Sequence, residues 1–225
     1  MTHKKYLIVR FSAMGDIVLT SPVVRVLSAR SGVEIHFLTK EIYRDLWKEN
    51  PNITKIYTIK KEINEVITFL KNENYTAVID LHANIRTLLL QFFLWNIPFY
   101  KMKKGSLLRW FYVQTGLKPS VPKHIVTRYI ETLNFLGLKY DGKGLDFFLP
   151  DDKFWVPEKP FILFVLGAGH FTKRIPLQKW KQIAEAFKQY RIILIGGEEE
   201  IDSGNILTEQ TENEVINQCG KLSIL

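Results

Sequence analysis

The strongest constraint on the fold of this chain is the pattern near its start, in residues 6–18. An apolar run rich in Ile and Val is followed by a turn of small residues, a single glycine, Asp16 and a new amphipathic pattern. This order predicts a buried strand, a tight turn and the N-terminus of a helix. Open α/β sheets bind their ligands at the carboxyl ends of the strands, where this turn would lie. The turn is therefore the first candidate for a functional site.

Asp16 has two interpretations. Its carboxylate can cap free N–H groups at the start of the helix and gain from the helix dipole, which is a structural role alone. The turn contains Gly15 but lacks the three glycines of a G-x-G-x-x-G fingerprint, and a carboxylate at this place repels a phosphate. We therefore expect the turn to meet a neutral, hydroxyl-bearing group, and a Rossmann dehydrogenase is disfavoured.

The pattern of strand, turn and helix continues as far as residue 138. Further strands are predicted at residues 33–39, 55–59 and 75–81. Strands that alternate with helices at this spacing predict a parallel, doubly wound sheet. His82 and Arg86 follow the fourth strand, so they also lie at a carboxyl end and are candidate ligand contacts. Capping and solvation explain such residues equally well.

Residues 139–160 are rich in Asp, Gly and Pro and lack helical periodicity, which indicates a domain boundary. We divide the chain into domains at residues 1–155 and 156–225. The second domain repeats the pattern with two apolar strands and a terminal stub, at residues 161–166, 191–197 and 214–225. Two parallel strands leave apolar faces unburied. We therefore expect the second domain to be incomplete.

The net charge of +8 and the sequence pI near 9.4 indicate an anionic partner, such as a nucleic acid, a membrane surface or a phosphorylated substrate. The single cysteine, Cys219, excludes an internal disulfide and suits a reducing compartment. The sequence has no signal-peptide pattern and no apolar stretch of the ~20 residues that span a bilayer. We expect a cytoplasmic protein.

Two neighbouring segments have compositions that could suit contact with a membrane. Residues 88–95 are unusually apolar, and we predict a buried helix there in preference to a membrane-touching face. Residues 101–124 contain basic and aromatic residues but no Asp or Glu, and these are Lys101, Lys103, Lys104, Arg109, Lys118, Lys123, Trp110, Phe111 and Tyr112. This mixture suits an anionic membrane or an acidic substrate. A solvated loop is the alternative, and no nucleic-acid motif accompanies the charge.

The second domain has candidate sites after its two strands. Gly167 opens a stretch of small residues that lets the backbone approach a ligand, and Lys173 and Arg174 add positive charge. These residues fit a phosphate cradle, although the Gly-Lys-Ser/Thr of a P-loop is missing. Residues 198–200 are three glutamates that follow the glycines of the second strand. One of them can bind ribose hydroxyls, and all three are also favourable at a helix start.

Residues 6–18, 80–86, 167–180 and 219–223 resemble, in matching order, the motifs of glycosyltransferase family 9, the lipopolysaccharide heptosyltransferases. The resemblance implies a GT-B-like α/β fold, in which two Rossmann-like parallel-sheet domains face a cleft. It also implies an inverting, metal-independent transfer of heptose from ADP-heptose to the lipopolysaccharide inner core, with no cofactor. The alternatives are a family member that transfers another sugar and a non-catalytic binder of anionic glycolipid.

The same resemblance assigns roles to individual residues. Asp16 matches the general base that takes the proton of the acceptor hydroxyl, and Lys173 matches the lysine that neutralises the leaving diphosphate. The acceptor-binding positions are Arg10, Ser12, His82 and Arg86. The other donor-binding positions are Gly167, Thr172, Glu198 and Glu199. No metal ligands are expected.

The sequence departs from the family's pattern at two places. Ile175 stands where the family usually has Trp, and the Asp-Thr-Gly-x-x-His block that completes the donor site is absent. We therefore expect a truncated donor domain. The implied partners are a lipid-linked saccharide acceptor, lipid A with its inner core, and the inner face of the cytoplasmic membrane, bound peripherally. No nucleic-acid partner is implied.

Overall fold

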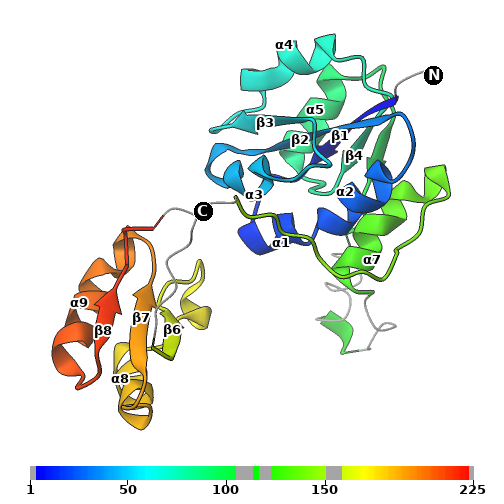
Figure 1. Cartoon of the computed structure of the whole chain (residues 1–225). Helices are drawn as coiled ribbons and strands as arrows, with labels where there is room; N and C mark the ends of the chain where they lie inside the picture. Colours follow the sequence, from blue (N-terminus) through cyan, green and yellow to red (C-terminus); the bar gives the residue numbers. More distant parts are fainter. Residues whose placement is uncertain (1–3, 105–113, 117–122, 151–158, 223–225) are drawn as a thin grey trace. The chain divides into compact units, whose positions relative to one another are not determined.

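The computed structural model describes residues 4–104, 114–116, 123–150 and 159–222. The chain divides into two compact units, Met1–Pro150 and Asp151–Leu225 (Figure 1). Each unit is built on its own parallel sheet, which confirms the predicted α/β class. Several residues of the basic segment lie outside the described residues, namely Arg109, Trp110, Phe111, Tyr112 and Lys118.

The first unit contains a five-stranded parallel sheet. Its strands are β1 (Lys4–Val9), β2 (Val33–Lys40), β3 (Lys55–Ile59), β4 (Ala77–Asp80) and β5 (Phe99–Lys101). They lie in the order β3-β2-β1-β4-β5, and every neighbouring pair is parallel. The order reverses between β1 and β4, which is the switch point at which doubly wound sheets bind ligands. The predicted doubly wound sheet is therefore confirmed.

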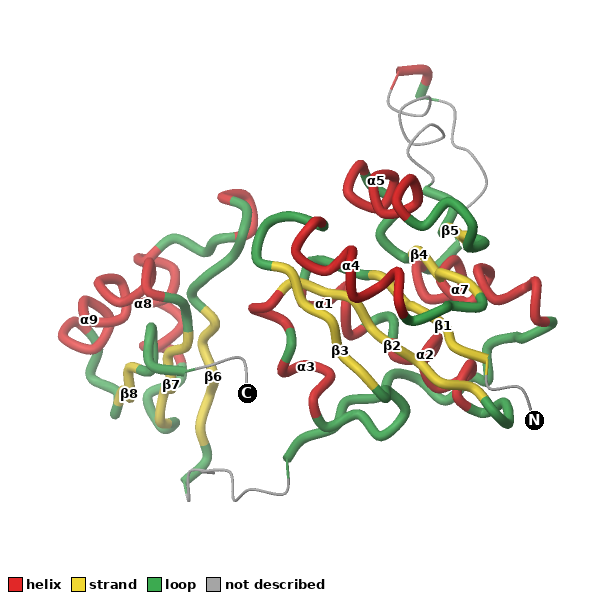
Figure 2. Tube along the Cα trace, turned by 90° about the horizontal axis from the view of Figure 1, so that it is seen from above, coloured by secondary structure: helices red, strands yellow, loops and turns green. Residues whose placement is uncertain are grey.

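Helices cover both faces of this sheet (Figure 1, Figure 2). They are α1 (Met14–Val18), α2 (Ser21–Ser28), α3 (Asp45–Lys48), α4 (Asn64–Asn72), α5 (Ile85–Phe93) and α7 (Ile125–Ile130), the last followed by a 3-10 helix, Glu131–Leu136. α4 and α5 lie on one face, where their residues Leu70 and Leu90 share a core with Leu7 and Val78. α2 and α7 lie on the other face, so β1 and β4 are buried on both sides.

The apolar helix α5 is buried on one side alone, so the prediction of a buried helix made from residues 88–95 is correct for that side and wrong for the other. Within α5, the buried residues are Thr87 and Leu90. The large exposed side chains are Ile85, Leu88, Leu89, Phe92 and, just beyond the helix, Trp95. A helix that is apolar all round predicts burial all round. α5, however, packs against the sheet through one side alone, and periodicity does not show what covers the other side.

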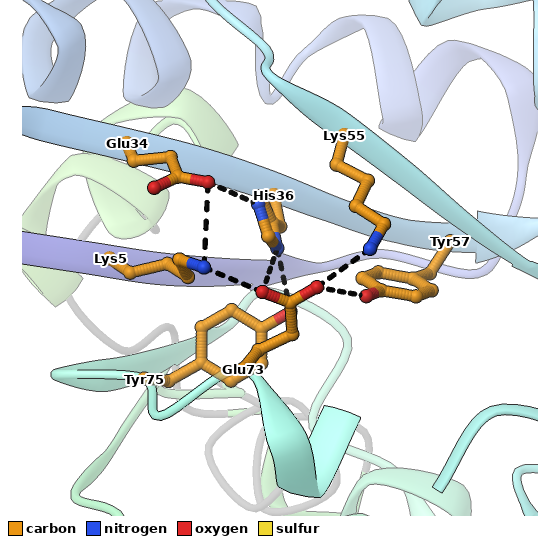
Figure 3. A network of polar contacts seen from close by, with 7 residues as sticks. All are labelled: Lys5, Glu34, His36, Lys55, Tyr57, Glu73 and Tyr75. Atoms are coloured by element: carbon orange, nitrogen blue, oxygen red, sulfur yellow. Dashed lines mark hydrogen bonds and ion pairs between the residues drawn. The ribbon is translucent and has the colours of Figure 1, made fainter. Parts of the chain in front are cut away.

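A polar network ties together the amino-terminal halves of β1, β2 and β3 (Figure 3). Glu73, which follows α4, accepts hydrogen bonds from Lys5 at 2.6 Å, from Lys55 at 2.7 Å and from the Tyr57 hydroxyl. Burial alone raises the pKa of Glu73, but these hydrogen bonds outweigh it and lower the pKa to about 2. His36 lies beside Glu73, and burial lowers the pKa of its imidazole. The network therefore fastens the end of α4 to the sheet.

The second unit contains a smaller sheet of three parallel strands in the order β6-β7-β8. They are β6 (Phe161–Val165), β7 (Arg191–Ile195) and β8 (Val215–Asn217). The sequence predicts two strands and a stub, and the third strand forms from that stub. Three residues carry too little pattern to reveal β8. The helices α8 (Leu177–Ala186) and α9 (Ile201–Gln210) lie on the same face of the sheet (Figure 2).

The other face of the smaller sheet is apolar and exposed along β6. Phe164 shares the core with Leu207 of α9. Phe161, Leu163 and Val165 point the opposite way and are between 40% and 55% exposed, because successive side chains of a strand alternate between faces. Among the described residues, the helices of this unit thus cover one face of β6. The expectation of an uncovered apolar face is confirmed.

We expect the amide hydrogens of the two sheets to exchange at different rates. β1 lies between β2 and β4 with both faces buried, whereas β6 is an edge strand with one face exposed. Exchange reports the free energy of local opening, so β1 amides should exchange more than about tenfold slower than β6 amides. Exchange followed by mass spectrometry measures this difference. Equal protection in the two strands would show that the second unit is as stable as the first.

Glu73→Gln should lower the free energy of unfolding by about 2 kcal/mol at neutral pH, because hydrogen bonds to a charged group each contribute about 1.5–3 kcal/mol. The Glu73 pKa falls from its ordinary 4.5 to about 2 on folding. The stabilisation is therefore complete above pH 4.5 and is lost as the pH falls toward 2. Denaturant titrations of parent and variant across this window measure the difference.

The exposed Glu62 lies near the start of α4 and supplies the matched control, Glu62→Gln, which should leave the unfolding free energy unchanged. A stability difference for Glu73→Gln that stays constant from neutral pH down to pH 2 would show that the ionised carboxylate is not its cause.

Candidate functional site

The candidate site of the first unit lies at the switch point of its sheet. β1 and β4 pair in parallel with Val9 opposite Asp80, so the turns after the two strands start side by side. These turns and the helices that follow them carry the predicted base and acceptor-binding residues, Arg10, Ser12, Asp16, His82 and Arg86. The fold thus brings two segments that are far apart in the sequence to the same edge of the sheet.

Arg10 and Asp16 form an ion pair within these turns. The Arg10 side chain is buried, and its Nη2 donates to Asp16 Oδ2 at 2.6 Å. Its Nη1 donates to the carbonyl oxygen of Leu81 at 2.7 Å, and the guanidinium carbon lies 5.7 Å from the centre of the Tyr129 ring. Arg10 therefore links the turn after β1 to the turn after β4 and to α7. It also holds one oxygen of the Asp16 carboxylate in place.

Asp16 lies in the first turn of α1, where its charge is favourable to the helix dipole, but it does not cap the helix, so the predicted capping role is wrong. The N-cap residue is Ala13, and Asp16 accepts no backbone N–H within the described part of the chain. The Asp16 side chain is 42% exposed, and no described residue donates a hydrogen bond to its Oδ1. A half-exposed carboxylate with one oxygen held and the other open can accept a proton from a bound ligand.

Asp80 shapes the turn after β4, although the sequence analysis gives it no function. It is fully buried, and its Oδ1 accepts the backbone N–H groups of His82 at 3.0 Å and Ala83 at 2.7 Å. Ala83 has a φ of 50°, a left-handed conformation that residues with a Cβ seldom adopt. The two hydrogen bonds stabilise this turn and hold His82 at the end of β4. An Asp at the end of an apolar strand is the sequence signal for such a turn.

A capping box fixes the start of α5. Asn84 Oδ1 accepts the backbone N–H of Thr87 at 3.1 Å, and Thr87 Oγ1 accepts that of Asn84 at 3.0 Å. Arg86, in the first turn of α5, is half-buried. Ser12 is also half-buried, and its peptide bond to Ala13 is cis. Neither Ser12 nor Arg86 forms a side-chain hydrogen bond with another described residue, so both can contact a ligand.

His82 is neutral at physiological pH. Burial lowers the pKa of its imidazole, and the positive charges of Arg10, Lys104 and Arg86 lower it further, to about 4. The ring packs edge-on against Phe11 with 5.3 Å between the ring centres. Its buried Nδ1 has no hydrogen-bond partner among the described residues. A neutral imidazole can hydrogen-bond a hydroxyl group but cannot pair with a phosphate as a cation does.

Tyr129 is a residue of this site that the sequence analysis missed. It lies on α7, far along the chain from Arg10, and its buried ring packs against the Arg10 guanidinium. Burial raises the pKa of the Tyr129 hydroxyl, whose oxygen has no hydrogen-bond partner among the described residues. No short-range pattern connects the two residues, so no signal in the sequence identifies this contact.

In the second unit, the loop after β6 lies against Glu200. Glu200 Oε2 accepts the backbone N–H of Gly197 at 2.9 Å, and the Glu200 side chain is 12% exposed. A Cβ atom on Gly167 would lie 2.9 Å from the same oxygen, so the loop approaches this closely because Gly167 has no side chain. Glu199, in contrast, is 78% exposed and pairs with Arg174 at 3.1 Å. Of the three glutamates, the carboxylate beside Gly167 is thus Glu200, and not Glu198 or Glu199, to which the family resemblance assigns the donor contact.

Lys173 places a positive charge in the same loop. It ends a short 3-10 helix, and it is exposed together with the neighbouring Thr172 and with Glu198. No described residue forms an ion pair with Lys173. The Arg174 side chain is engaged, since its Nε donates to the carbonyl oxygen of Ala168 at 2.9 Å. An unpaired ammonium group beside a glycine-containing loop suits an anionic ligand.

Neither a metal cluster nor a helix that spans a membrane is found among the described residues. These residues contain no group of three His, Cys, Asp or Glu side chains placed to hold a metal ion. Their helices are also too short or too polar for any to cross a bilayer. Cys219 is free of a disulfide and buried in the core of the second unit, and burial raises the pKa of its thiol.

Residues 63–225 match glycosyltransferase family 9 (heptosyltransferase). Lipopolysaccharide heptosyltransferase 1 of Campylobacter coli is 30% identical over 166 residues, which are 69% of this chain and 48% of the relative. The chain thus spans about half the length of that relative. A family 9 glycosyltransferase from Veillonella parvula matches 99% of this chain and 72% of its own, with a TM-score of 0.80 and 22% identity. The structure of E. coli heptosyltransferase WaaC with ADP-2-deoxy-2-fluoro heptose matches 98% of this chain and 77% of its own chain, with a TM-score of 0.71 and 20% identity.

The two solved structures share the fold of this chain, so the parallel-sheet units described above are those of a GT-B-like glycosyltransferase. The family match covers well over half of the chain. The chain belongs to glycosyltransferase family 9, and the resemblance noted in its sequence is confirmed.

Proposed function

We propose that this protein transfers heptose from ADP-heptose to the inner core of lipopolysaccharide by an inverting, metal-independent reaction. Its membership of family 9 supports this proposal. The Campylobacter coli relative is named as a lipopolysaccharide heptosyltransferase, and the similar WaaC structure contains an ADP-linked heptose analogue. The nucleotide sugar is the donor, and no separate cofactor takes part.

The observation that carries the proposal is the half-exposed Asp16 carboxylate held through one oxygen by Arg10. In the proposed step, the acceptor hydroxyl oxygen attacks the anomeric carbon of the donor, and Asp16 Oδ1 takes the hydroxyl proton. The bond between that carbon and the ADP oxygen breaks, and its electron pair leaves with ADP. Attack opposite the leaving group inverts the anomeric centre. Arg10 acts as a positioning residue, because it holds Oδ2 and leaves Oδ1 open.

The first unit is proposed to bind the lipid-linked acceptor around Asp16. The neutral His82 suits a sugar hydroxyl, and Ser12 adds a second neutral hydrogen-bonding group. Arg86 supplies a charge for the phosphate groups of an anionic glycolipid. The hydrogen bonds of Arg10 are made within the chain, so Arg10 acts on the acceptor through Asp16.

The second unit is proposed to bind the ADP part of the donor. Lys173, whose charge no described residue balances, stabilises the diphosphate as negative charge develops on it. Gly167 brings the donor-binding loop close to the Glu200 carboxylate, and Thr172 offers a hydroxyl beside Lys173. The exposed Glu198 and Glu199 are the proposed contacts of the ribose hydroxyls.

The proposed acceptor is anchored in lipid, so the proposed place of action is the inner face of the cytoplasmic membrane, reached from the cytoplasm. The net charge of +8 favours such an anionic surface. We propose a peripheral association with the membrane and no nucleic-acid partner.

Asp16→Asn should reduce turnover by about 10²–10⁴-fold, because an amide cannot accept the proton. The fold and the affinity for acceptor should remain, since the Asn Oδ1 can still accept the Arg10 hydrogen bond. Release of ADP from ADP-heptose with an inner-core acceptor measures the reaction. Asp45→Asn, which changes an exposed carboxylate on α3, is the matched control and should keep the parent rate.

Three other results would overturn parts of this proposal. Turnover of Asp16→Asn within about threefold of the parent would reduce Asp16 to a structural residue. Acceptor binding without ADP release by the parent would identify a non-catalytic glycolipid binder. Faster release from another nucleotide sugar would identify a different donor.

Lys173→Ala should weaken ADP binding by about tenfold or more, because a charge-assisted contact with the diphosphate is lost. Titration calorimetry with ADP measures the affinity. Lys179→Ala is the matched control: Lys179 lies nearby on α8, and its Nζ donates to Gln182 of the same helix at 3.1 Å. An unchanged affinity in Lys173→Ala would exclude Lys173 from the donor site.

A further inference from the structure

One side of α5 forms an exposed apolar stripe. Its members are Ile85, Leu88, Leu89, Phe92 and Trp95, and they are between 48% and 83% exposed. The first four are spaced i, i+3, i+4 and i+7, so they lie on one side of the helix, and Trp95 follows its last turn. We call these five residues the α5 stripe. The opposite side packs into the core of the unit through Leu90 and Leu94.

The stripe differs from a single exposed apolar residue such as Phe69 of α4. Phe69 has the exposed polar residues Glu65 and Asn72 four positions before it and three positions after it, on the same side of that helix. Single exposed apolar side chains are ordinary, but contiguous ones mark a surface that another apolar body covers. We therefore expect another apolar body to cover the α5 stripe, and the charges around the stripe indicate which kind.

The surroundings of the stripe are positively charged. Residues 81–130 contain no Asp or Glu. Arg86 lies on α5, and Lys101, Lys103 and Lys104 lie at the end of β5 and directly after it. β5 pairs with β4 so that Lys101 lies opposite Asp80, which places this end of β5 at the edge of the sheet where α5 begins, and the charges of Lys104 and Arg86 both reach His82. None of these four cations forms an ion pair with a described residue. The stripe is thus flanked by unbalanced positive charge.

We propose that the α5 stripe docks the protein onto an anionic lipid bilayer. Apolar side chains on one side of a helix enter the boundary between headgroups and acyl chains, and flanking cations bind the lipid phosphates. Trp95 suits this boundary, where indole rings concentrate. The inference deepens the proposed function, which requires a membrane-borne acceptor. The turn that carries His82 leads directly into α5, so docking places the acceptor site beside the lipid surface.

A second copy of this chain is the competing partner. A symmetric dimer would place the same residues of both copies against each other. The four cations of one copy would then face those of the other, and like charges across an interface weaken binding. An anionic bilayer covers the apolar side chains and balances the charge, so both observations favour it.

Co-sedimentation of the 225-residue chain with phosphatidylglycerol vesicles, without acceptor or nucleotide sugar, tests the proposal. Leu88→Ser/Phe92→Ser should weaken vesicle binding by about tenfold or more, because the apolar contact is reduced. Ile42→Ser/Phe69→Ser removes two exposed apolar side chains elsewhere in the unit and should keep the parent affinity. Lys101→Ser/Lys103→Ser/Lys104→Ser should also weaken binding and flatten its salt dependence.

Trp95 gives a second measurement, which is made on the unchanged parent chain and uses a variant of Trp95 only as its control. Its fluorescence should shift to shorter wavelength when vesicles are added, and the shift should disappear in Trp95→Phe. Parent-like binding by Leu88→Ser/Phe92→Ser, or no Trp95 shift in the parent, would overturn the proposal. A concentration-dependent dimer that Leu88→Ser/Phe92→Ser abolishes, without vesicle binding, would assign the stripe to self-association.

These outcomes are separate from those of the sugar transfer. Vesicle binding without ADP release would leave the docking surface standing and overturn the transfer reaction. Transfer to a soluble acceptor without vesicle binding would leave the transfer reaction standing and overturn the docking surface.

Discussion

The parallel pairing of β1 with β4 is the constraint on which the first unit depends. It places Val9 opposite Asp80, and the two following turns then share one edge of the sheet. Arg10 can reach the Leu81 carbonyl and the Asp16 carboxylate at once only because of this register. A slip by one residue would turn the side chains of β4 to the opposite face. The register therefore also accounts for the burial of a charged residue, since a buried guanidinium requires such partners.

The sequence predicts those parts of the fold and site that depend on short-range pattern. Residues 55–59 are predicted as a strand and form β3 with the same bounds, because an apolar run there is flanked by turn residues. Asp16 stands out for the same reason, since it directly follows a strand and a turn. Tyr129 does not stand out, because its contact with Arg10 depends on the path of the chain through a whole unit. Glu200 is indistinguishable from its two neighbouring glutamates until the Gly197 hydrogen bond is seen.

α5 and β6 show a different limit of sequence reasoning. Both are correctly recognised as apolar, yet hydropathy does not tell which element covers a given face. On β6 the exposed residues alternate with core residues, and the exposed face belongs to a sheet with helices on its other side. On α5 the exposed residues form a continuous side of a helix with unbalanced cations nearby. The hydropathy of the two segments is similar, but the exposed face of β6 belongs to a sheet, whereas the exposed side of α5 is a helix surface with cations nearby.

The burial of Arg10 restricts how this family member can change over evolutionary time. An apolar residue in place of Asp16 leaves the Arg10 guanidinium without a counter-charge or a hydrogen-bond acceptor in a mostly desolvated place, which costs stability. A change that keeps this stability therefore has to alter both positions, for example by replacing the charged pair with apolar residues that pack on Tyr129. The ion pair thus couples two positions of the turn after β1, so that a substitution at one sets which residues the other can tolerate.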